Sequence, residues 1–150
     1  MTQPTMQAIQ VYAFGGPEQL RLETLARPEP ASGEVLVRIH AIGVLPADWK
    51  MRRGDFHKAG ATARFPYIPG SAFSGVVEAL GPGATDFAVD QAVFGRTTHG
   101  AYAEYTTVAT DTLALKPDAV SFAEAATISG GETSMSTRAR SVGSASGVTA

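Results

Sequence analysis

Glycine and proline interrupt this chain so often that only short structural elements fit between them. The 150 residues include 16 glycines and 9 prolines, and several of the stretches between them alternate apolar and polar side chains. Such alternation is typical of strands with one buried face. Short strands separated by turn residues favour a mostly β, partly open barrel with short helices over alternating βαβ units.

The strands that this pattern predicts are residues 6–12, 20–23, 34–42, 70–80, 92–95, 101–108 and 112–116. The turn residues Gly15-Gly16-Pro17 join the first two into a hairpin. Gly81-Pro82-Gly83 turns the chain after the fourth strand, through positions that few other residues tolerate. The extent of the sixth strand makes Tyr102, Glu104 and Tyr105 ordinary strand residues.

Two short helices are predicted from their terminal residues. Pro46 suits the first turn of a helix that runs to Arg53, and Gly54 can supply its left-handed exit. Ser121-Phe122-Ala123-Glu124 has the spacing of a capping box, so a second helix should begin at the phenylalanine.

The chain changes character after Gly130-Gly131. The residues that follow are rich in serine, threonine, alanine and glycine and show little apolar periodicity. Gly143 to Gly147 lacks the preceding buried strand and the following helix that a phosphate-binding turn needs. We therefore expect one folded domain over residues 1–130, followed over 131–150 by an irregular tail or the start of a truncated inter-domain helix.

The charge balance argues against several classes of partner. The 12 Lys and Arg and 14 Asp and Glu are spread along the chain and give a net charge of −2, so no strong field would attract nucleic acid or an anionic membrane. The first residues lack the pattern of a signal peptide, and no apolar run approaches the length of a membrane span. We expect a cytoplasmic protein with neither nucleic acid nor membrane as partner.

The sequence contains no cysteine, which removes disulfides, thiolate nucleophiles and cysteine-ligated zinc. Carboxylates and the histidines His40, His57 and His99 are the remaining metal ligands. None of these histidines has a carboxylate at the spacing of a catalytic relay, so we expect them to be hydrogen-bonded or exposed.

Four segments, taken in order, carry a family resemblance. They are GVLPADWKMRRG (43–54), IPGSAFSGVVEALGPG (68–83), GAYAEY (100–105) and KPDAVSFAEAATI (116–128). Together they resemble the zinc-independent medium-chain dehydrogenase/reductase superfamily, and in particular its quinone oxidoreductase-like branch. The resemblance implies an N-terminal GroES-like barrel, which in family members is joined to a Rossmann domain that binds NADP(H). We expect the Rossmann domain to be absent from this chain.

The family divides by chemistry, and the resemblance implies that this chain uses no zinc. The zinc-dependent branch holds its metal with cysteine, histidine and glutamate at the positions of Leu45, Ser71 and Ala72. Leucine and alanine have no lone pair to donate, and serine alone is a poor zinc ligand. We therefore assign no metal site.

In zinc-free relatives, hydride passes from NADPH to a quinone or an activated alkene (enone), so the protein must position two rings and polarise a carbonyl. Lys50 stands where several enone-reducing relatives carry a lysine. Its ammonium would act as the catalytic group that stabilises negative charge on the substrate oxygen. A solvated lysine beside Arg52 and Arg53 is the alternative.

The resemblance implies three further contacts. Leu45 replaces an asparagine that faces the cofactor or substrate in relatives, and Phe56 stands at an often aromatic position, so both are substrate-binding candidates. Thr133 corresponds to a threonine that bonds near the nicotinamide, which makes it the cofactor-binding candidate. Ordinary packing of Phe56 and a tail position for Thr133 are the alternatives.

Two aspartates have expected structural roles. Asp48 matches an acidic position in the first helix, where we expect it to cap the helix or fix a loop. Relatives usually carry glycine at Asp90, so this aspartate would be strained if the turn needs positive φ.

The resulting hypothesis is the N-terminal part of an NADPH-dependent, zinc-independent oxidoreductase that transfers hydride to a small-molecule quinone or enone. A Rossmann segment missing from this chain would be its partner. The alternative is a noncatalytic GroES-like remnant or assembly module, whose unpaired barrel edges would form a homo-oligomer. An enoyl-reductase segment of a polyketide-type synthase shares the fold and cofactor and is a third hypothesis.

Overall fold

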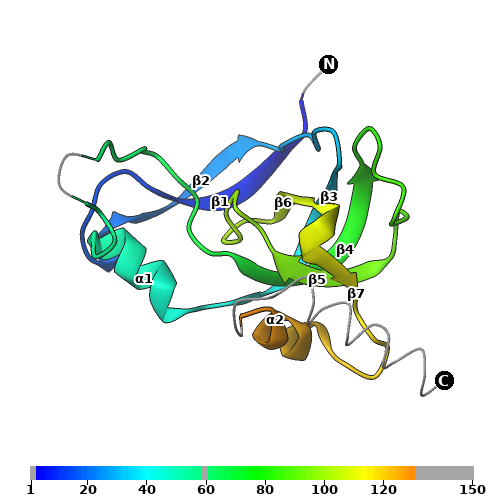
Figure 1. Cartoon of the computed structure of the whole chain (residues 1–150). Coiled ribbons are helices and arrows are strands. Elements are labelled where there is room, and N and C mark those ends of the chain that lie inside the picture. The colour runs from blue at the N-terminus through cyan, green and yellow to red at the C-terminus, as the bar shows by residue number, and fades with distance from the viewer. Residues whose placement is uncertain (1–2, 59–60, 131–150) are drawn as a thin grey trace.

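The computed structural model describes residues 3–58 and 61–130 (Figure 1). These residues form a mostly β unit with short helices, as the sequence pattern predicts. Its strands are β1 (Thr5–Val11), β2 (Leu20–Ala26), β3 (Glu34–Gly43), β4 (Ala72–Leu80), β5 (Ala92–Arg96), β6 (Tyr105–Ala109) and β7 (Leu113–Leu115). Its helices are α1 (Pro46–Arg53) and α2 (Phe122–Gly130), with the single 3₁₀ turns η1 (Pro17–Gln19) and η2 (Thr110–Thr112).

The strand pairs within the described residues are all antiparallel. β1 and β2 form a hairpin of their own, and the other strands follow the order β6-β3-β4-β5-β7. Two isolated bridges, Ala8 to Ala103 and Val11 to Tyr67, attach the hairpin to the rest of the barrel. Figure 1 shows α1 at one end of the hairpin and α2 below the larger sheet. A βαβ unit needs a parallel pair, so residues 3–58 and 61–130 contain none.

The central strands β3 and β4 carry the main core. Register shifts in their ladder, at Leu36/Val37 and Ile39/Ala41, bend the two strands and let the sheet curl around the buried side chains. The core cluster comprises Val35, Val37, Phe73, Val77, Ala84, Val93, Ala101, Val108 and Leu113.

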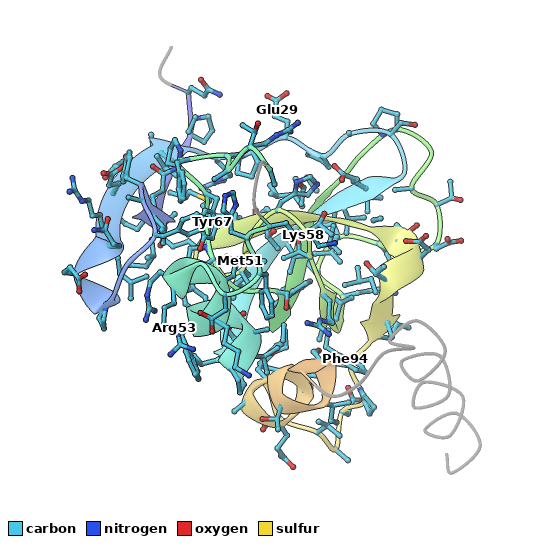
Figure 2. All side chains as sticks on the ribbon, turned by 60° about the vertical axis from the view of Figure 1, so that its left-hand side comes forward. Glu29, Met51, Arg53, Lys58, Tyr67 and Phe94 are labelled. Atoms are coloured by element: carbon cyan, nitrogen blue, oxygen red, sulfur yellow. The ribbon has the colours of Figure 1, made fainter. Side chains whose placement is uncertain are left out.

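α2 closes one side of the sheet over a second, smaller core. Phe94, Ala114 and Ala125 form this core, and Figure 2 places Phe94 beside the helix. The predicted capping box is confirmed: the amide of Glu124 donates to Ser121 Oγ at 3.1 Å, and the amide of Ser121 donates to Glu124 Oε1 at 3.2 Å. The helix therefore begins where the sequence predicts, at the residue after the serine.

Both β4 and β6 begin later than the sequence pattern predicts. Gly70 and Gly100 have φ angles of 90° and 99°, so the chain turns at each instead of extending. Tyr102 and Glu104 consequently lie before β6, and the prediction that they are strand residues is wrong. Tyr105 is in the strand, as predicted.

Asp90 occupies a left-handed conformation, with φ of 75°. Its amide donates to the Val77 carbonyl at 2.8 Å, which holds the turn against β4. The positive φ on which the expected strain depends is therefore present.

Replacing Asp90 by glycine should raise the free energy of unfolding. An L-residue in this region costs about 1–2 kcal/mol, and the extra freedom of glycine in the unfolded chain offsets roughly 0.5–1 kcal/mol of that. We expect a net gain of about 0.5 kcal/mol in urea denaturation, whereas Asp90→Ala should give no gain. A lower urea midpoint for Asp90→Gly would contradict this account.

The predicted domain boundary at residue 130 stays a prediction, because residues 131–150 lie outside the described part of the chain. The helices of the described part are too short, or too polar, to cross a lipid bilayer.

Candidate functional site

A cleft of about 830 Å³ opens between α1, the segment before β4 and the turn after β5. Its volume falls in the range of small-molecule sites. Figure 2 labels Met51 of α1 and Tyr67 of the segment before β4, and both residues line this cleft. The walls are Gln10, Phe14, Ala47, Asp48, Met51 and residues 56–57, 63–71 and 96–99.

Aromatic rings cover one wall of the cleft. The ring of Phe14 lies 5.0 Å from that of His57 and 5.1 Å, edge-on, from that of Phe65. Phe65 in turn lies 6.0 Å from Tyr67, measured between ring centroids. A planar ring entering the cleft would meet aromatic faces and edges, the arrangement in which aromatic pairs attract.

Tyr67 adds a polar group to this wall. Its hydroxyl oxygen is buried and has no hydrogen-bond partner among the described residues. Burial raises the pKa of Tyr67, so the hydroxyl stays protonated and able to donate. An unsatisfied buried hydroxyl costs about 1–3 kcal/mol.

Asp48 fixes α1 to the barrel. Its Oδ2 atom accepts hydrogen bonds from the Leu45 amide and from the Tyr102 hydroxyl, each at 2.9 Å. Burial, followed by the bond to Asp48, raises the pKa of Tyr102. The carboxylate thus caps the helix and ties it to the segment before β6, which confirms the expected structural role of Asp48.

Arg96, the last residue of β5, lines the cleft. Its Nη2 donates to the Ser71 hydroxyl at 2.9 Å, and the Thr97 amide donates to the Ser71 carbonyl at 2.9 Å. These two bonds hold the start of β4 and the end of β5 together. The guanidinium is therefore held at a defined place on the cleft wall.

The comparisons with known proteins assign this architecture. Residues 31–118 match the model of the alcohol dehydrogenase GroES-like domain. The chain belongs to this family. It is 38% identical over 128 residues to the quinone oxidoreductase of Homo sapiens, a match that covers 84% of this chain and 38% of the relative.

Solved structures agree with this assignment. The human synaptic vesicle membrane protein VAT-1 homolog-like protein superimposes with a TM-score of 0.77 at 33% identity, over 82% of this chain and 39% of that one. A mycobacterial protein solved in complex with NADPH superimposes with a TM-score of 0.72 at 34% identity. This match covers 86% of this chain and 36% of the mycobacterial one. This GroES-like chain thus spans less than half the length of the relatives it matches, and its quinone oxidoreductase homologues place it in the medium-chain dehydrogenase/reductase superfamily.

The three positions that bind metal in the zinc-dependent branch lie near one another in this GroES-like domain. A Cβ atom added to Gly130 would lie 2.7 Å from Leu45 Cδ2 and 3.8 Å from Ala72 Cβ, so an apolar contact occupies this place. Ser71 is engaged by Arg96. Across residues 3–58 and 61–130, no three His, Cys, Asp or Glu side chains gather as metal ligands. Zinc independence itself remains a prediction.

The predicted site residues are only partly brought together. Phe56 lines the cleft and is 55% exposed. Leu45 packs beside Gly130, and Lys50 lies on α1 with its Nζ 5.7 Å from the Trp49 ring; neither lines the cleft. The roles of all three stay predictions, and Thr133 lies outside the described residues.

Most residues of the cleft wall are not predicted by the sequence pattern. Phe14, Phe65, Tyr67 and Arg96 come from three separate segments that only the folded barrel brings together. The Phe-Pro-Tyr run at 65–67 is a local signal, because binding residues are concentrated on loops that a rigid scaffold positions.

Proposed function

We propose that this chain is the substrate-side part of an NADPH-dependent, zinc-independent oxidoreductase that transfers hydride to a quinone or enone in the cytoplasm. The observation that carries the proposal is the aromatic wall of the cleft, in a chain 38% identical to a quinone oxidoreductase. Flat, conjugated rings match flat aromatic walls. Nucleic acid and membranes have no part in this function.

Substrate binding depends on the aromatic wall, with Phe56 at the rim. Lys50 lies on α1 outside the cleft, so its ammonium would have to turn toward the substrate oxygen to stabilise the negative charge that develops during reduction. Leu45, where relatives carry asparagine, also lies outside the cleft and would give an apolar contact to a ring that extends beyond it. Leu45, Ser71 and Ala72 provide no metal ligand set, so charge stabilisation rests on protein groups.

The cofactor fits the described residues only in part. NADPH supplies a hydride when bound, and its nicotinamide ring is suited to a cleft with aromatic walls. Its pyrophosphate needs a glycine turn between a buried strand and a helix N-terminus, which residues 3–58 and 61–130 do not contain. We therefore assign the phosphates to a Rossmann segment and a nicotinamide contact to Thr133.

The proposal predicts that the chain binds a neutral quinone through Phe56. Titration with 2-methyl-1,4-naphthoquinone, followed by quenching of Trp49, the only tryptophan, reports the affinity. Phe56→Ala should raise the dissociation constant about fivefold, since an aromatic pair contributes about 1 kcal/mol. Because the chain has no cysteine, no thioether adduct with the quinone can form.

Leu22→Ala is the matched control, because Leu22 is 68% exposed on β2 and does not line the cleft. Its affinity for the quinone should equal that of the wild type. A second readout tests the cofactor: NADPH should raise the melting temperature of the chain, as any ligand that binds only the folded form does. If saturating NADPH leaves the melting temperature unchanged, the cofactor part of the proposal fails for this chain.

The second candidate is a noncatalytic assembly module. It is favoured by β2, whose outer edge pairs with no other strand in the described part of the chain. Exposed strand edges are templates for pairing with another copy. Oligomers in size-exclusion chromatography, together with no quinone binding, would favour this module over the reductase.

A further inference from the structure

Arg96 is a cation that lines the cleft and has no role in the proposed reaction. Its side chain is half-buried in a cleft with largely apolar walls, and it forms no ion pair with a carboxylate of residues 3–58 and 61–130. A guanidinium has five N–H donors, and the Ser71 hydroxyl accepts from one of its terminal nitrogens. Buried charges in proteins are normally paired, so this arginine has unused capacity for an anion.

The other polar side chains of the cleft strengthen this argument. Arg64 also lines it, and His99 is bound to Glu34 at 3.1 Å. The one carboxylate among the lining residues, Asp48, already accepts hydrogen bonds from a backbone amide and from a tyrosine. Two guanidinium groups, those of Arg64 and Arg96, thus line the cleft against one carboxylate, which already accepts two hydrogen bonds.

We propose that Arg96 binds an anionic oxygen of the ligand, so that the preferred substrates are quinones or enones that carry an ionised acidic oxygen. This inference rests on the proposed function and narrows its substrate class. The planar guanidinium suits two oxygens of one carboxylate, or an ionised oxygen and the adjacent ring carbonyl. Ser71 holds the guanidinium in place, so little side-chain freedom is lost when the anion binds.

Three probe compounds distinguish recognition of the ligand's negative charge from recognition of its quinone ring. 2-Hydroxy-1,4-naphthoquinone is an anionic quinone at neutral pH, 2-methyl-1,4-naphthoquinone is its neutral counterpart, and 2-naphthoate is an anion that is not a quinone. Titration calorimetry on the full chain gives a dissociation constant for each. We expect Arg96→Met to raise the dissociation constants of both anions about tenfold or more. The dissociation constant of the neutral quinone should change by less than about twofold.

Two further variants complete the design. Arg96→Lys keeps the charge but loses the planar fork, so it should restore part of the affinity for the anions. Arg38→Met is the matched control, because Arg38 lies on β3 outside the cleft in an exposed pair with Glu78 at 3.5 Å. It should leave all three affinities unchanged.

The outcomes distinguish this inference from the proposed function. Equal weakening of all three probes by Arg96→Met, or no weakening of the anions, overturns the anion site and leaves the quinone cleft standing. Binding of both anions through Arg96 without binding of the neutral quinone supports the anion site and counts against quinone reduction. If no probe binds the folded chain, both proposals fail.

Discussion

Gly75→Ala is expected to destabilise the fold more than any other single substitution proposed for this chain. Gly75 lies in the middle of β4, where it crosses the bent part of β3, and a Cβ atom there would lie 2.2 Å from the carbonyl oxygen of Arg38. Backbone of the neighbouring strand, and not a flexible side chain, would have to move. We expect Gly75→Ala to lower the free energy of unfolding by roughly 3 kcal/mol or more, measured by urea denaturation.

Gly33→Ala is the control for this experiment. Gly33 has φ of 77°, but a Cβ atom there would meet nothing within 4 Å. Its replacement should cost only the left-handed conformation, about 1 kcal/mol. Equal losses at the two positions would show that steric contact between β3 and β4 is not what requires glycine at position 75.

Removal of the Asp48 carboxylate is expected to have the second large effect. Asp48→Ala leaves the Leu45 amide uncapped and the partly buried Tyr102 hydroxyl without its partner. The lost cap costs about 1 kcal/mol and the unsatisfied group about 1–3 kcal/mol, so we expect a loss of about 3 kcal/mol in urea denaturation. Because α1 forms part of the cleft, the variant should also bind 2-methyl-1,4-naphthoquinone more weakly.

Asp48→Asn is the control, since its side-chain oxygen can accept both hydrogen bonds, and it should retain most of the stability. The tyrosine side of the pair has a pH signature. Because the folded-state pKa of Tyr102 is raised above 10.0, its contribution to stability is complete below pH 10.0 and is lost as the pH rises toward the folded-state value. Tyr102→Phe should reduce this alkaline loss, and an unchanged alkaline slope would contradict the assigned contact.

The parts of the fold that the sequence predicted correctly depend on local signals. The serine and glutamate of the capping box at 121–124 lie within one turn of each other, and Gly54 directly follows the helix that it ends, with φ of 94°. In both cases the deciding contacts involve neighbours in the chain. The positive φ at Asp90 was predictable in a different way, from the resemblance to relatives that usually carry glycine at this position.

The candidate site depends on contacts between distant residues, which no local pattern reveals. Asp48 and Tyr102 are 54 positions apart, and the hydroxyl of Ser71 meets a guanidinium 25 positions away. The family resemblance predicts a catalytic role for Lys50. The cleft, however, is lined by other residues of α1, namely Ala47, Asp48 and Met51. The aromatic wall consists of segments that are distant in the sequence and become neighbours only in the folded barrel.

The attachment of the β1–β2 hairpin links ligand binding to the beginning of the chain. One of the two bridges that hold this hairpin joins Val11 to Tyr67, and Phe14, just beyond β1, lies on the same aromatic wall. A ligand that rests on these rings would touch both the hairpin and the barrel at once. Its binding would therefore stabilise the attachment of the hairpin, because the complete aromatic wall exists only while the two parts lie together.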